Sequence, residues 1–292
     1  MKKLRLFSLG LSLTLALSAL AGEKLTLKGI TSGEFRSQSM SAVRPMADGE
    51  TYAQISDDGK RIVTYSFRTG KQVGVLFDAA TARGAEVKSV DGYILSPDGS
   101  RILIQTNTKA IYRRSFTATY YIYSIRNNKM EPLSDGGPQQ TPVFSPDGNQ
   151  IAFVRDNNIW LVKLLYDNAE SQVTKDGKRN EIINGIPDWV YEEEFSTNSS
   201  MVFSADSKQI IWIRYDESAV KQYSMQLFKG AKPERTEFAE YPGDYTYKYP
   251  VPGQVNSQVS VWSYDIQSRQ TRQIDVPLDA DGYIPRIKAT SD

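Results

Sequence analysis

Short runs of β-branched and aromatic residues follow the same polar turn at four places in the chain. The turns have the pattern Ser-x-Asp-Gly, with Ser207 in place of glycine in the last one, and begin at residues 56, 96, 145 and 204. The steps from 56 to 96, from 96 to 145 and from 145 to 204 are 40, 49 and 59 residues. A period near 40 is typical of a four-stranded propeller blade, and the longer steps indicate insertions.

Each turn has a local physical cause. Aspartate can hydrogen-bond to its own backbone, and glycine accepts the positive φ that the chain needs before the next strand. The third unit predicts a whole blade, with strands at residues 141–144, 150–155, 159–164 and 171–174. The repeats therefore predict an all-β fold, an incomplete β-propeller of about four four-stranded blades.

The last residues continue the pattern. Residues 259–266 alternate like a strand, 267–269 form a polar turn, and 284–289 are a further run that leads into residues 290–292, which resemble the start of a fifth turn. Propeller blades are stable when the ring closes, because open edges leave backbone groups unpaired. We therefore expect residues 22–292 to be the N-terminal propeller segment of a longer protein, ending within a blade.

The N-terminus has the composition of an export signal. Basic residues at positions 2, 3 and 5 precede an apolar run from 6 to 20, and Ala19-Leu20-Ala21 fits a signal-peptidase site. The sequence predicts a signal peptide of bacterial type over residues 1–21 and a periplasmic or secreted protein. The alternative is that residues 1–21 stay attached as an uncleaved membrane anchor. After residue 21 no apolar run is long enough to span a membrane.

The composition excludes several kinds of chemistry. The chain has no histidine and no cysteine, so it cannot assemble a Ser-His-Asp triad, a thiol nucleophile, a disulfide or a Cys/His zinc site. Its 35 basic and 34 acidic residues give no bias toward nucleic acid or an anionic membrane. We predict no cofactor and no metal, although a site made of carboxylates alone remains open.

One acidic segment stands out, with the sequence Asp-Trp-Val-Tyr-Glu-Glu-Glu at residues 188–194. Three consecutive glutamates are usually a solvated surface. Here turn-forming residues precede them and two aromatic residues can hold the segment against the body of the protein. A short helical turn would direct two adjacent glutamates toward one cavity and the first, Glu192, elsewhere. Paired carboxylates suit a bound ammonium group, which has three donors.

This segment resembles the signature of the dipeptidyl peptidase IV family, serine exopeptidases related to prolyl oligopeptidase. The turn spacing and residues 111–123 are similar too. In that family a propeller caps an α/β-hydrolase domain. The resemblance implies that Glu193 and Glu194 bind the free amino terminus of a substrate. It also implies that Arg113, which lies two residues before the segment Ser-Phe-Thr-Ala, contacts a substrate carbonyl. Arg114 could take that role instead, and a cross-strand ion pair is the simpler explanation for Arg113.

No Gly-x-Ser-x-Gly elbow occurs in the sequence, so this chain holds no catalytic residue of the family. We therefore predict the substrate-binding and gating portion of an exported serine exopeptidase that removes N-terminal Xaa-Pro or Xaa-Ala dipeptides, inactive by itself. Its partners would be peptides with a free N-terminus, the missing α/β-hydrolase domain and a second copy in a homodimer. The alternative is a non-catalytic exported propeller that binds protein or peptide partners.

Overall fold

The computed structural model describes residues 25–37, 42–230, 234–279 and 281–290. The predicted signal peptide, residues 1–21, lies outside these ranges. The chain divides into two units, residues 1–42 and 43–292, which are treated separately here. The first contains the short helix α2 (Leu27–Ser32), which Thr26 caps through its hydroxyl and Gly33 ends with a φ of 83°. None of the helices in the described ranges has the length and apolar character needed to cross a bilayer.

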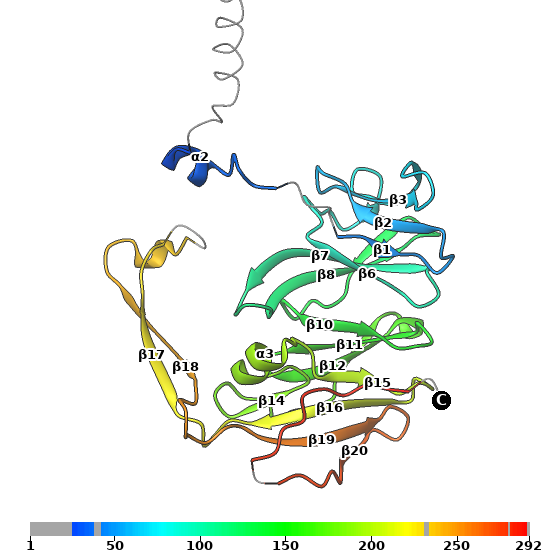
Figure 1. Cartoon of the computed structure of the whole chain (residues 1–292). Helices are drawn as coiled ribbons and strands as arrows, with labels where there is room; N and C mark the ends of the chain where they lie inside the picture. The colour runs from blue at the N-terminus through cyan, green and yellow to red at the C-terminus, as the bar shows by residue number, and fades with distance from the viewer. Residues whose placement is uncertain (1–24, 38–41, 231–233, 280, 291–292) are drawn as a thin grey trace, which may run out of the picture. The chain divides into compact units, whose positions relative to one another are not determined.

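The second unit contains four sheets of four successive antiparallel strands, as the repeats predict (Figure 1). β5 (Arg83–Gly84) adds a parallel strand to the second sheet, and β15 (Met201–Phe203) pairs with β16 beside β14 in the fourth. The strands of the four sheets are, in order: β1 (Arg44–Pro45), β2 (Thr51–Ile55), β3 (Arg61–Ser66), β4 (Gln72–Asp78); β6 (Gly92–Leu95), β7 (Arg101–Ala110), β8 (Phe116–Ser124), β9 (Lys129–Pro132); β10 (Gln140–Phe144), β11 (Gln150–Arg155), β12 (Asn158–Lys163), β13 (Ala169–Gln172); β14 (Ile182–Asn184), β16 (Gln209–Asp216), β19 (Gln258–Asp265), β20 (Gln270–Ile274).

Neighbouring sheets pack face to face through alternate residues of their strands. In β11, Ile151 and Phe153 join the core shared with the second sheet, whereas Ala152 and Val154 join the core shared with the fourth. Successive side chains of a strand point to opposite faces. Both faces of this sheet are therefore covered, which explains why residues 150–154 form a nearly continuous apolar run instead of alternating with polar residues.

Each Ser-x-Asp turn connects two antiparallel strands, and the strands that follow the four turns are β3, β7, β11 and β16. In all four turns the serine hydroxyl donates to the aspartate at 2.5–2.7 Å and accepts the backbone N–H five residues beyond the serine at 2.9–3.0 Å. Gly59, Gly99, Gly148 and Ser207 all have a positive φ, between 61° and 70°. The local chemistry of the motif thus starts the strand after each turn at a fixed position.

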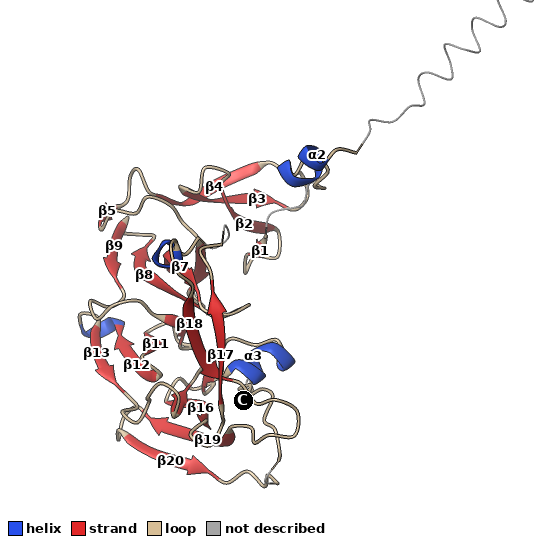
Figure 2. Cartoon of the chain, turned by 90° about the vertical axis from the view of Figure 1, so that its left-hand side faces the viewer, coloured by secondary structure: helices blue, strands red, loops and turns tan. Residues whose placement is uncertain are grey.

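Two insertions accompany the fourth sheet, the first within the 59-residue step and the second after the last turn. The helix α3 (Trp189–Phe195) lies between β14 and β15, and a hairpin of β17 (Gln222–Leu227) and β18 (Gly243–Lys248) lies between β16 and β19 (Figure 2). Two single-turn 3-10 helices, η1 (Leu164–Tyr166) and η2 (Thr236–Phe238), occur in connections. The hairpin was not predicted from the sequence.

The expected strand at residues 284–289 is not present. This segment instead runs against α3, where the Ile284 N–H donates to the Tyr191 hydroxyl at 3.3 Å and Arg286 donates to the Phe195 carbonyl at 2.7 Å. An apolar run becomes a strand only beside an unpaired edge of the right register. Within the described residues, 284–289 pair with no strand and contact α3 instead.

Candidate functional site

The acidic segment forms a helix because Asp188 caps it. The Asp188 carboxylate accepts the backbone N–H of Tyr191 at 2.9 Å, and the seven-residue helix α3 ends at Ser196, which has a φ of 54°. An aspartate at the N-cap satisfies a backbone donor that the helix itself leaves free. The predicted helical turn is confirmed.

Two buried groups hold α3 against the fourth sheet. The Tyr191 side chain is 1% exposed, and its ring contacts those of Tyr215 and Phe195 at centroid distances of 4.9 and 5.1 Å. The second oxygen of Asp188 accepts the Ser257 hydroxyl at 2.5 Å. Burial raises the pKa of Asp188, against the lowering effect of these hydrogen bonds. The helix is therefore anchored at its beginning by polar bonds and in its middle by aromatic packing.

Arg113 reaches this helix from the tip of the β7–β8 hairpin. Its Nε lies 2.8 Å from one carboxylate oxygen of Glu193 and 3.2 Å from the other. Arg114 Nη1 lies 4.0 Å from the same carboxylate, so the shorter contact belongs to Arg113. The Arg113 side chain is 70% exposed and that of Glu193 is 18% exposed. Residues 80 positions apart in the sequence are thus brought into contact.

Arg113, Glu193 and Glu194 line one cavity of about 770 Å³. Its wall includes Trp189 and, from the hairpin, Met225, Leu227, Arg235, Tyr245 and Tyr247. The ring of Trp189 lies 6.2 Å from that of Tyr247 and 4.4 Å from that of Tyr249, which joins the base of the hairpin to α3. We call this the acidic cavity. All three residues predicted for the site border it.

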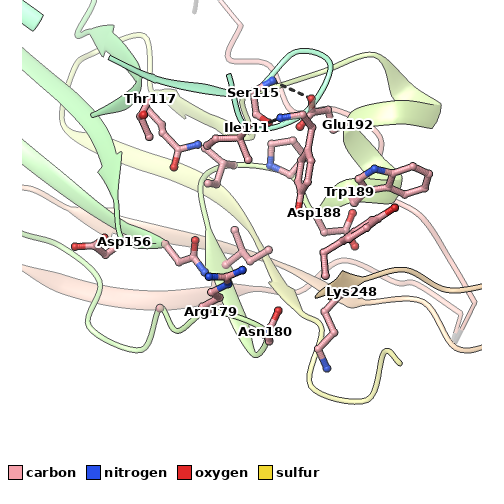
Figure 3. A pocket seen from close by; sticks show the side chains of 18 of the residues that line it. Ile111, Ser115, Thr117, Asp156, Arg179, Asn180, Asp188, Trp189, Glu192 and Lys248 are labelled. Carbon is pink, nitrogen blue, oxygen red and sulfur yellow. Dashed lines mark hydrogen bonds between the residues drawn. The ribbon is translucent and has the colours of Figure 1, made fainter. Parts of the chain in front are cut away.

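Glu192 points elsewhere, into a second cavity of about 680 Å³ (Figure 3). It is 1% exposed, and its Oε1 accepts the backbone N–H groups of Arg114 at 2.6 Å and Ser115 at 2.8 Å. The sequence indicated the different direction of Glu192 but not these bonds. Its donors lie 77 and 78 positions away, so no local pattern could have revealed them.

The second cavity contains charges of both signs. Figure 3 shows Asp188 and Glu192 on one side of it and Arg179 and Lys248 on the other. Glu217 also lines this cavity, and burial, with a smaller contribution from Asp188, raises the pKa of Glu217 to about 7 while Lys248 opposes the shift. The described residues contain no cluster of three acidic side chains arranged to hold a metal ion.

The sequence-based prediction assigned no role to Asp188, Glu192 and Ser257, and it considered Arg114 only in place of Arg113. The capping role of Asp188 could have been found, because Pro-Asp before an apolar and acidic run is a helix-start pattern. The other three depend on partners far along the chain, and no sequence signal marks them.

The geometry suits recognition of a cation rather than bond cleavage. Two glutamates and a guanidinium face one cavity with aromatic walls, but the chain has no histidine to act as the base of a serine nucleophile. The fold and the site together define a propeller segment with two glutamates and an arginine at one cavity.

Comparisons with known proteins agree with this class. A profile described as "Dipeptidyl peptidase IV (DPP IV) N-terminal region" matches residues 96–292. The chain therefore belongs to the dipeptidyl peptidase IV family and corresponds to its N-terminal propeller region.

Individual relatives and structures agree. A probable dipeptidyl-aminopeptidase B from Emericella nidulans is 35% identical over 286 residues, which cover 89% of this chain and 30% of that protein. The corresponding protein of Podospora anserina is 34% identical, with 87% and 30% covered. The crystal structure of Porphyromonas gingivalis dipeptidyl peptidase 4 is similar with a TM-score of 0.86 and 43% identity, over 93% of this chain and 38% of that one. The chain thus spans less than a third of the two curated relatives' length.

Proposed function

We propose that this chain is the substrate-binding and gating portion of an exported serine exopeptidase that removes Xaa-Pro and Xaa-Ala dipeptides from free N-termini. The observation that carries the proposal is the meeting of Arg113, Glu193 and Glu194 at one cavity. The catalytic triad would come from an α/β-hydrolase domain, because this chain contains no histidine.

The two carboxylates would bind the substrate ammonium. An ammonium group has three donors and needs charge compensation when it leaves water. Glu193 already holds a cation, the Arg113 guanidinium, at 2.8 Å. Because that arginine is largely exposed, its ion pair is weak, and a substrate ammonium could replace it. Arg113 would then be free to donate to a carbonyl of the bound peptide.

This arrangement would determine how many residues of the substrate precede the scissile bond. An ammonium fixed at a set distance from the serine would leave room for only two residues before the scissile bond. A blocked N-terminus would leave desolvated carboxylates without a partner, which is costly enough to exclude it.

A propeller that merely binds protein partners is the second candidate. Its support is the exposed apolar surface of the β17–β18 hairpin and the segments next to it, where Tyr223, Phe228 and Tyr241 are 46%, 63% and 80% exposed. That surface also suits a homodimer of the complete protein. A scaffold, however, has no need for a guanidinium and two carboxylates at the acidic cavity.

A binding experiment on the 292-residue chain tests the proposal. The tripeptide Ala-Pro-Ala and its N-acetyl form are titrated against the wild type, Glu193→Ala and Glu194→Ala. Each substitution removes a charge-assisted bond, so we expect the free-amine peptide to bind about tenfold to a hundredfold more weakly. Glu131→Ala, on β9 away from the acidic cavity, is the matched control and should bind as the wild type does.

Acetylation should abolish binding to the wild type. Equal affinity for the two peptides, or no loss in either glutamate variant, would show that the carboxylates do not anchor an amine. The scaffold would then be the better interpretation.

A further inference from the structure

The two parts of the acidic cavity belong to different sheets. Arg113 lies on the loop that joins β7 and β8 in the second sheet, whereas Glu193 and Glu194 lie on α3 beside the fourth. A peptide that contacts both parts needs them at a fixed separation. The question is which contacts set that separation.

The visible ion pair is a poor candidate. Arg113 is 70% exposed, and exposed ion pairs contribute little because water screens them and both side chains lose rotamer freedom. Glu193 would also leave this pair when an ammonium binds to it. The contact between Arg113 and Glu193 therefore cannot keep the loop in place during recognition.

A second set of bonds joins the same two segments and does not involve Arg113 or Glu193. Glu192 Oε1 accepts two backbone N–H groups, from Arg114 at 2.6 Å and from Ser115 at 2.8 Å. Arg114 Nη2 donates to the Ser196 hydroxyl at 3.0 Å, and Asn198 donates to the Arg114 carbonyl at 3.2 Å. These four bonds link the loop to the middle of the acidic helix and to the residues at and just beyond its C-terminal end.

Glu192 is the central member of this set. Its side chain is 1% exposed, so its two bonds are shielded from water, and a carboxylate bound to backbone N–H groups forms strong, short hydrogen bonds. The donors are the nitrogens of the two successive peptide bonds that follow Arg113. Holding them fixes the backbone from which the Arg113 side chain extends.

We infer that Glu192 is a positioning residue for the amine site: from the second cavity, without touching the ligand, it holds the Arg113 loop on α3. The inference rests on the proposed function. It assigns the three consecutive glutamates two different tasks, with Glu193 and Glu194 facing the ligand and Glu192 facing the protein.

The competing explanation is that Glu192 attracts the ammonium as a third negative charge. One atomic detail separates the two. Both hydrogen bonds end on Oε1, and the amide oxygen of glutamine can also accept two bonds, although without the assistance of a charge. Glu192→Gln therefore keeps the positioning bonds and removes the charge, whereas Glu192→Ala removes both.

The experiment titrates Ala-Pro-Ala against the 292-residue chain as wild type, Glu192→Ala, Glu192→Gln, Arg113→Ala and the double variant Arg113→Ala/Glu192→Ala. We expect Glu192→Ala to bind about tenfold more weakly, because two buried donors lose their acceptor, and Glu192→Gln to bind within about twofold of the wild type. In the Arg113→Ala background the alanine at position 192 should have little further effect, since coupled residues are non-additive.

Three results would overturn the inference. Wild-type affinity in Glu192→Ala would show that the bonds do not matter. Weak binding by Glu192→Gln would show that the charge itself acts on the ligand. Full additivity with Arg113→Ala would show that Glu192 does not act through that loop. If Glu192→Ala does not fold, Glu192→Gln alone decides between the two explanations.

The failure of the proposed function would look different. In that case the wild type would not distinguish the free-amine peptide from its acetylated form, and the inference would fall with it. If the wild type does distinguish them and Glu193→Ala binds poorly, an unaffected Glu192→Ala overturns only the positioning role.

Discussion

Replacing Asp188 by alanine should loosen the acidic helix at its beginning. The carboxylate is 7% exposed and makes two bonds, one to the Tyr191 N–H at 2.9 Å and one to the Ser257 hydroxyl at 2.5 Å. Loss of an N-cap costs about 1 kcal/mol. A buried hydroxyl left without its acceptor adds about 1–3 kcal/mol.

Part of this loss is offset. Burial raises the pKa of Asp188, which means that the folded protein keeps a carboxylate in an environment that disfavours its charge. Alanine removes that cost, so we expect a net destabilisation of about 2 kcal/mol. For a unit of this size the melting temperature should fall by about 4–8 °C.

The matched control is Asp188→Asn. Asparagine caps helices as well as aspartate does, and its amide can donate to the Ser257 hydroxyl. We expect a change below about 1 kcal/mol in this variant. Urea and thermal unfolding, followed by circular dichroism and tryptophan fluorescence, measure both variants. An alanine variant as stable as the wild type, or an asparagine variant as unstable as alanine, would refute this account of how α3 is held.

Two further predictions concern pH and activity. The pKa of Glu217 is raised from its ordinary 4.5 to about 7, so between these pH values the folded state binds more protons than the unfolded state. The free energy of unfolding should therefore fall as the pH rises from about 4.5 to about 7. Above pH 7 this contribution should stay constant. Glu217→Gln should lose this pH dependence and be about 1–2 kcal/mol more stable than the wild type at pH 8. Urea unfolding midpoints of both proteins at pH 5 and pH 8 measure this. The same change in midpoint with pH in both proteins would contradict the prediction. Separately, the purified chain should not hydrolyse a Gly-Pro reporter, because it has no histidine, and turnover that survives rigorous purification would contradict this.

The sequence by itself determined the parts of this protein that depend on neighbours in the chain. Each Ser-x-Asp turn is closed by hydrogen bonds that span two to five residues, so the motif alone predicts where the strand after each turn begins. The third blade was predicted nearly strand by strand for the same reason. The helical turn of the acidic segment followed from local composition, whereas its cap at Asp188 was not predicted, although a helix-start pattern marks it.

The three site residues were predicted in another way. The composition of the three consecutive glutamates alone favoured a solvated acidic surface. Only the resemblance to a family singled out Arg113, Glu193 and Glu194. The structure brings them to one cavity. Their proposed role in binding an amine stays a prediction.

The tertiary structure decided everything that depends on distant partners. Residues 284–289 have the apolar pattern of a strand, yet they form none and contact α3 instead, and those contacts join residues about 90 positions apart. Glu192 looked like one more member of an acidic run until its donors, more than 70 positions away, gave it a buried structural role. The reason is the same in both cases: a hydrogen bond or a packed face depends on distance in space, and the folded backbone alone fixes that distance.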